Sequence, residues 1–124
     1  MTRHIYTSLF LLIAIFATFG LSGCSDDLGA YRPTPSVFEV KPISSIELEE
    51  SEGVMDFEIK AGNLGWWIET DQDWISPTKK YGSGDGKATL KFTTNNSGNP
   101  RSAQVTFHPT MDVKPVSFTI KQKK

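Results

Sequence analysis

Cysteine is nearly absent from this 124-residue chain, which contains Cys24 and no other. One cysteine excludes an intramolecular disulfide and any metal site built from several thiolates. Histidine is scarce too, with only His4 and His108. The sequence pattern gives His108 no evident partner for metal binding or acid–base chemistry. We therefore expect neither a bound metal nor a cofactor.

An excess of one charge sign is also missing. Lys and Arg number 13 and Asp and Glu 14, for a formal net charge of −1. A near-neutral surface of mixed charges exerts no general attraction on nucleic acid. The balance excludes the class of basic nucleic-acid-binding domains, and we expect no nucleic-acid partner.

The chain has no long hydrophobic run, because the apolar stretch from Leu9 to Phe19 is too short to span a bilayer comfortably. It follows a weakly basic start at Arg3 and precedes small residues, which is typical of a secretory signal peptide. Its end, Leu21-Ser22-Gly23-Cys24, resembles the lipobox of bacterial lipoproteins. That resemblance implies a signal peptide over residues 1–23 and a lipidated Cys24 that anchors the chain to a membrane. The alternative is an ordinary secretory signal with a chance cysteine.

The residues after Cys24 are polar, with Pro33 and Pro35 stiffening an irregular segment. We expect a flexible tether over residues 24–36. Ser25, Asp26 and Asp27 resemble the signal that exports lipoproteins to the outer face of the outer membrane in Bacteroidetes. The expected location is the cell outer membrane, lipid-anchored and surface-exposed, although a solvated linker explains the same residues. Residues 37–124 have the length of one domain.

Period-two alternation of apolar and polar residues recurs through this domain. The clearest segments are residues 55–59, 88–92, 103–107 and 116–120, and turns rich in Gly and Asn separate the segments. No stretch of ten residues has a convincing helical period. Short alternating segments at close spacing predict an all-β fold, an antiparallel β-sandwich of about seven strands.

The segment "GWWIETDQDWIS" contains all three tryptophans. Alternate residues of a strand point to opposite faces of the sheet. Trp66 and Ile68 share the apolar face, so Trp66 is expected in the core and Trp67 on the exposed face. The predicted core comprises Trp66, Ile68, Trp74, Phe57, Phe92, Phe107 and Phe118, with Trp74 at its edge.

The order of several residues resembles the BACON domain, the Bacteroidetes-associated, carbohydrate-binding, often N-terminal domain. The matching positions are Trp66 and Trp74 with a nearby aliphatic after each, Pro77, the glycines from Gly82 to Gly86, Asn95 or Asn96, Arg101 and Gln122. The resemblance covers residues 54–124, and it departs from the family pattern at "TKKY" and at Trp67. It implies an immunoglobulin-like sandwich and a role in binding glycans or mucin, although some such domains are spacers.

Exposed aromatic rings can stack on the apolar faces of sugars. Trp67 and Tyr81 are the candidates, with Glu69, Asn63 or Lys91 offering hydrogen bonds to hydroxyl groups. The alternatives are that Trp67 packs under the N-terminal segment or a neighbouring strand, and that Tyr81 covers one end of the sandwich. Arg101 and the "NNSGNP" loop are interpreted as structural.

Enzyme motifs are missing. "GSGDGK" lacks the spacing of a phosphate-binding loop, and Asp71 and Asp73 lack the later residues of a calcium loop. We find no catalytic constellation and predict a non-catalytic surface lipoprotein module that binds glycans or mucin. The alternative is a structural or accessory subunit, or a spacer, that contacts another outer-membrane protein. An exposed Trp67 beside polar groups favours the first function, and a broad apolar patch favours the second.

Overall fold

The structure is a computed structural model that describes residues 32–124. The predicted signal peptide, the predicted lipidation site Cys24 and most of the predicted tether lie outside the described residues. Pro35–Lys124 form one compact unit. Within the described residues, no helix is long and apolar enough to cross a membrane.

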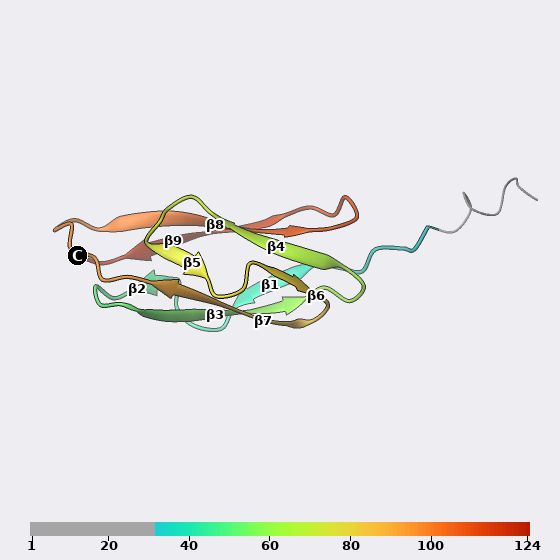
Figure 1. Cartoon of the computed structure of the whole chain (residues 1–124), viewed down its shortest axis with the longest axis horizontal. Helices are drawn as coiled ribbons and strands as arrows, with labels where there is room; N and C mark the ends of the chain where they lie inside the picture. Colours follow the sequence, from blue (N-terminus) through green and yellow to red (C-terminus); the bar gives the residue numbers. More distant parts are fainter. Residues whose placement is uncertain (1–31) are drawn as a thin grey trace, which may run out of the picture. The chain divides into compact units, whose positions relative to one another are not determined.

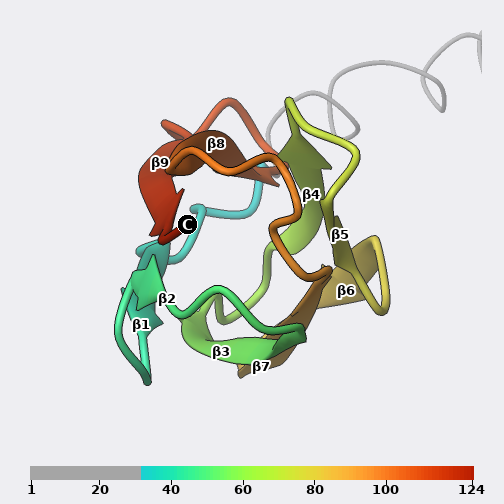
Figure 2. The ribbon, with the colours of Figure 1, turned by 90° about the vertical axis from the view of Figure 1, so that its left-hand side faces the viewer.

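Nine strands make up the described fold (Figure 1). They are β1 (Glu39–Pro42), β2 (Glu47–Leu48), β3 (Gly53–Lys60), β4 (Gly65–Thr70), β5 (Ile75–Pro77), β6 (Tyr81–Ser83), β7 (Gly86–Phe92), β8 (Arg101–Pro109) and β9 (Val116–Gln122). A four-stranded sheet has the order β1-β3-β7-β5, and a five-stranded sheet has the order β2-β9-β8-β4-β6. The two sheets face each other as two layers (Figure 2). The predicted all-β sandwich is confirmed.

Two details differ from the expected architecture. The strands number nine rather than about seven, because β2, β5 and β6 are only two or three residues long and too short to show alternation. In addition, β2 pairs with β9 in parallel, whereas all other pairs are antiparallel. Between β5 and β6 the chain passes from one sheet to the other, and this crossing uses the "TKKY" segment.

The core lies between the sheets and is filled by the inward-facing residues of the long strands. Phe57 on β3, Phe107 on β8 and Phe118 on β9 form an aromatic cluster, with ring centroids 5.0 Å apart for Phe57–Phe107 and 5.1 Å for Phe57–Phe118. Ile68 and Phe92 are buried, whereas Trp74 and Phe118 are partly buried against the core. Apolar area removed from water is the main stabilising contribution in such a core.

Trp66 is buried above a glycine of the neighbouring edge strand. It pairs with Gly82 of β6, and its indole Nε1–H donates a hydrogen bond to the Gly84 carbonyl, 3.2 Å away. A Cβ atom at position 82 would overlap the Trp66 ring. The missing side chain at Gly82 therefore lets the indole lie across β6 and close this edge of the core.

The segment before β1 is fixed to the β3–β4 turn. Ser36 N–H donates to Asn63 Oδ1 at 2.9 Å, and Asn63 N–H donates to Ser36 Oγ at 3.1 Å. Two residues further on, Phe38 is buried in the core. The compact unit thus includes Pro35 and Ser36, which the sequence interpretation assigned to the tether.

Candidate functional site

Three aromatic side chains lie side by side on the outer face of the five-stranded sheet. Trp67 on β4 is directly opposite Tyr81 on β6 and His108 on β8. The neighbours of Trp67 along β4, Trp66 and Ile68, point into the core. Since side chains alternate along a strand, Trp67 must point outward. The pairing register therefore aligns three aromatic rings across three strands.

The indole of Trp67 stacks on the imidazole of His108. The ring centroids are 4.0 Å apart and the ring planes differ by 12°. His108 Nε2 also lies 2.8 Å from Glu69 Oε2. The imidazole covers one face of the indole, so Trp67 is half-buried rather than exposed as the alternation predicted. Trp67 does pack against a neighbouring strand, which was the alternative raised for it.

The opposite face of the indole is turned toward β6, because Trp67 stands between His108 and Tyr81 in the register. Tyr81 is 64% exposed. Lys80 Nζ lies 5.8 Å from the Trp67 ring centroid and 5.6 Å from that of Tyr81, which is within the range of a cation–π contact. We call Trp67, Glu69, Lys80, Tyr81 and His108 the Trp67 face.

Two of the predicted ligand-binding candidates lie away from this face. Asn63 is in the β3–β4 turn and is hydrogen-bonded to Ser36. Lys91 is on β7, exposed on the outer side of the four-stranded sheet. Trp67 and Lys91 therefore lie on opposite outer faces of the sandwich and cannot contact the same sugar ring. The structure brings together Trp67, Glu69 and Tyr81 but separates them from Asn63 and Lys91.

Arg101 and Gln122 form a polar network at the end of the sandwich near the C-terminus. Arg101 Nε donates to Gln122 Oε1 at 2.7 Å, and the Arg101 guanidinium lies 4.4 Å from the Trp74 ring centroid. Gln122 is 1% exposed, and its Nε2 donates to the carbonyl oxygens of Glu49, Glu50 and Thr93. Within the described residues, no buried side-chain nitrogen or oxygen lacks a partner. These contacts give Arg101 a structural position.

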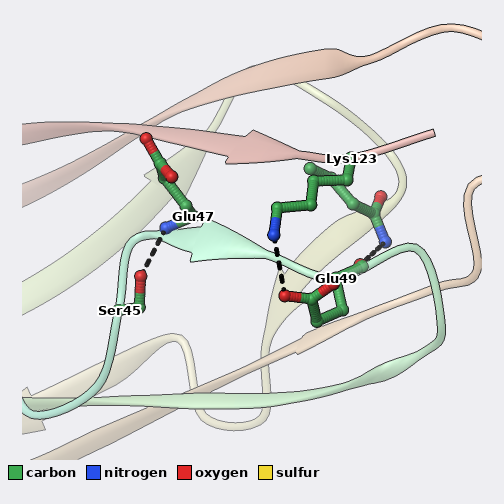
Figure 3. Close-up of polar contacts among 5 residues, drawn as sticks. Ser45, Glu47, Glu49 and Lys123 are labelled. Atoms are coloured by element: carbon green, nitrogen blue, oxygen red, sulfur yellow. Dashed lines mark hydrogen bonds and ion pairs between the residues drawn. The ribbon is translucent and has the colours of Figure 1, made fainter.

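Side chains around β2 complete this network (Figure 3). Lys123 Nζ lies 3.0 Å from Glu49 Oε1, and the Glu47 N–H donates to Ser45 Oγ at 3.1 Å. Asn95, which is 3% exposed, donates through Nδ2 to the carbonyl oxygens of Asn99 and Lys123. Of the two asparagines matched to the family pattern, Asn95 is therefore the buried one.

Two carboxylates have pKa values below their ordinary value for structural reasons. The Gly62 and Ala61 N–H groups donate to Asp85 Oδ1 and lower the pKa of Asp85. The Thr89 hydroxyl donates to Asp56 Oδ1 at 2.6 Å and is the main cause of the lowered pKa of Asp56. Both carboxylates accept hydrogen bonds that stabilise their charged form. In residues 32–124 there is no group of three or more His, Cys, Asp or Glu residues arranged to hold a metal ion.

His108 and Lys80 are the members of the Trp67 face that sequence reasoning missed. His108 was left without a partner because it is 39 residues from Glu69. Alternation places His108 on the same outward face of its strand as Gln104 and Thr106, but it does not reveal which strand lies beside it. The contact between His108 and Glu69 could have been predicted only if the sequence had revealed that β4 pairs with β8.

Comparison with known proteins gives a family and a fold. Residues 65–123 match the model of the BACON family, described as "Putative binding domain, N-terminal". No curated protein sequence matches the chain. A similar solved structure is "Bacteroides ovatus GH5 xyloglucanase in complex with a XXXG heptasaccharide", with a TM-score of 0.60 and 17% identity over 68% of this chain. The chain covers 19% of that protein's length, and a likeness at this identity shows the fold alone.

Proposed function

Because this chain carries a BACON domain over residues 65–123, we propose that it is a non-catalytic carbohydrate-binding module and that the Trp67 face holds the sugar. The observation that carries the proposal is the alignment of Tyr81, Trp67 and His108 across three adjacent strands. A row of rings on a sheet presents several contact positions to an extended oligosaccharide. The xyloglucanase of which 19% resembles this chain in fold was solved in complex with a heptasaccharide, and we include that oligosaccharide among the probes.

Each side chain of the Trp67 face has a chemical role in this proposal. Tyr81, which is 64% exposed, offers its ring to the apolar face of a pyranose, and the β6-facing side of Trp67 extends this surface. Lys80 donates hydrogen bonds to hydroxyl oxygens, and Glu69 accepts them. His108 stacks on Trp67 and fixes the orientation of the indole, which lowers the entropy lost on binding.

A binding measurement tests this function. The full chain, purified in detergent, is titrated with mucin and with cello-, xylo-, manno- and chito-hexaose and the xyloglucan heptasaccharide. The Tyr81→Ala variant should weaken binding by roughly tenfold, because a lost stacking contact costs on the order of 1 kcal/mol or more. Ile43→Ala is the matched control, since Ile43 is 58% exposed and lies outside the Trp67 face. Absence of binding across the panel would contradict the proposal.

We further propose that acyl chains on Cys24 hold the module on the outer membrane, facing outward. The support is the sequence Leu21-Ser22-Gly23-Cys24 followed by Asp26 and Asp27. Two or more acyl chains hold a protein stably on a membrane, whereas a single chain gives only marginal binding. The Cys24→Ala variant should lose incorporation of radiolabelled palmitate and appear in the soluble fraction. Protease treatment of intact cells should digest the wild-type protein only if it faces outward.

The alternative is an accessory subunit or spacer that contacts another outer-membrane protein. Large exposed apolar side chains in the described part of the chain are Val37, Ile43, Ile46, Val54, Tyr81 and Met111, and of these only Ile43 and Ile46 share a segment, the loop between β1 and β2. Scattered exposed apolar residues are normal and do not indicate an interface. Co-purification of one membrane protein in stoichiometric amount, with no glycan bound, would establish this alternative.

A further inference from the structure

A concave surface lies on the four-stranded sheet, on the side of the sandwich opposite the Trp67 face. It is a cleft of about 560 Å³ where β3 begins and β7 ends, lined among others by Glu52, Val54, Asp73, Trp74, Ser76 and Lys91. We call it the Trp74 cleft. Its volume falls within the roughly 300–1,000 Å³ that is typical of small-ligand sites. Lys91, which the sequence grouped with Trp67, is thus part of a separate cleft.

Strand register builds one wall of the Trp74 cleft. Lys91 on β7 is directly opposite Val54 on β3 and Ser76 on β5. Side chains directly opposite one another in an antiparallel pair lie close together on the same face. Val54 is 60% exposed and supplies apolar surface next to an ammonium group and a hydroxyl group.

Trp74 forms an apolar wall that is fixed in place. The Arg101 guanidinium lies 4.4 Å from the Trp74 ring centroid, and hydrogen bonds to Gln122, Thr93 and Thr94 hold Arg101. The Thr93 N–H also donates to the Trp74 carbonyl at 3.0 Å. A ring held by its neighbours can bind a ligand without first losing conformational freedom.

Four polar side chains that line the cleft have no side-chain partner among the described residues, whereas the Thr93 hydroxyl accepts a hydrogen bond from Arg101. Glu52, Asp73, Ser76 and Lys91 make no side-chain hydrogen bond or ion pair there. The Lys ion pairs of the described residues join Lys87 to Asp56 and Lys123 to Glu49. Two carboxylates and a hydroxyl can accept hydrogen bonds, and an ammonium and a hydroxyl can donate them. This mixture matches sugar hydroxyl groups, each of which both donates and accepts.

We propose that the Trp74 cleft is a second carbohydrate site that binds the end of a neutral oligosaccharide, one or two pyranose units long. The apolar face of the sugar packs on Trp74 and Val54, and its hydroxyl groups bond to Glu52, Asp73 and Lys91. Two carboxylates against one ammonium disfavour an acidic sugar. The ligand class rests on the proposed function, whereas the position of the site does not. Two sites on opposite sheets would let one module bind two glycan chains and gain avidity.

Titration with disaccharides tests the cleft. The probes are cellobiose, xylobiose, mannobiose, lactose and diacetylchitobiose, added to the full chain in detergent and followed by calorimetry. The double variant Lys91→Ala with Asp73→Asn should weaken disaccharide binding by roughly tenfold or more, because each hydrogen bond to a charged group contributes about 1.5–3 kcal/mol. Lys41→Ala, an exposed lysine on β1 of the same sheet, should leave the affinity within about twofold.

The outcomes separate the two sites. Disaccharide binding that depends on Lys91 and Asp73 but not on Tyr81 supports the cleft, even if hexaoses fail to bind the Trp67 face. Disaccharide binding that is lost in Tyr81→Ala and unchanged in the double variant would contradict a sugar site in the Trp74 cleft. It would leave the proposed function of the Trp67 face intact. Absence of disaccharide binding by the wild-type chain would also contradict a sugar site in the Trp74 cleft.

Discussion

The indole of Trp67 and the imidazole of His108 are stacked with centroids 4.0 Å apart and an interplanar angle of 12°. They belong to strands that are paired in the sheet but far apart in the sequence. This pair couples the stability of the β4–β8 pairing to the orientation of the aromatic ring proposed to contact sugar. Both effects can be measured separately.

A double-mutant cycle tests the ring pair. We expect Trp67→Ala and His108→Ala to destabilise the fold by less together than the sum of their separate effects. The coupling should be about 0.5–1.5 kcal/mol, as for other aromatic pairs. Urea unfolding of the four proteins provides the free energies. Strictly additive effects would contradict a stabilising contact between the two rings.

Substitution of Gly82 tests the packing of the buried Trp66 against β6. Gly82→Ala should destabilise the domain by about 1–3 kcal/mol, because its methyl group would overlap the Trp66 ring and force the core to shift. Gly86→Ala is the matched control: nothing lies within 4 Å of a Cβ placed there. Thermal unfolding should show a lower Tm for the first variant only. Equal Tm values would mean that Trp66 does not lie over β6.

Substitution of Arg101 tests how much the polar network at the C-terminal end of the sandwich contributes to stability. Arg101→Lys should cost about 1.5–3 kcal/mol, since lysine cannot reproduce the fork of donors that bonds Gln122 and Thr93. Lys121→Ala, an exposed position on β9, should change the free energy of unfolding by less than about 0.5 kcal/mol. If Arg101→Lys unfolds at the same urea concentration as the wild type, the network contributes little to stability.

The pH dependence of folding stability tests the hydrogen bonds that Asp85 accepts from the β3–β4 turn. Its pKa is lowered in the folded state, chiefly by the Gly62 N–H and also by the Ala61 N–H. The stabilising contribution is therefore present above the ordinary value of 3.8 and is lost as the pH falls through the lower folded-state pKa. The stability difference between wild type and Asp85→Asn should be constant near neutral pH and shrink below pH 4. A difference independent of pH would exclude a stabilising role for the charge.

The long strands could be predicted from the sequence because one of their faces is polar and the other apolar. The alternation over Met55–Ile59 and Ala103–Phe107 assigns an inner and an outer face to β3 and β8, and the structure buries Phe57 and Phe107 accordingly. The two-residue β2 has no alternation to read, and its parallel pairing with β9 depends on contacts more than 70 residues apart in the chain.

The candidate site could be predicted only in part, because alternation reveals the face of a strand but not the sheet that contains it. Lys91 and Trp67 both point outward, yet they lie on opposite sheets. Asn63 is near Trp67 in sequence but bonds to Ser36. His108 joins Trp67 through register alone. Register depends on which long-range pairs pack best, and the local alternation of one strand does not reveal it.

The central claim is that the Trp67 face binds carbohydrate, and Tyr81 tests it most directly because this exposed ring can be removed without opening the core. Wild type, Tyr81→Ala and Ile43→Ala should be compared for binding to the hexaose panel and to mucin at equal thermal stability. We predict that wild type and Ile43→Ala bind at least one probe equally and that Tyr81→Ala binds it roughly tenfold more weakly. Equal binding by all three proteins would contradict the claim.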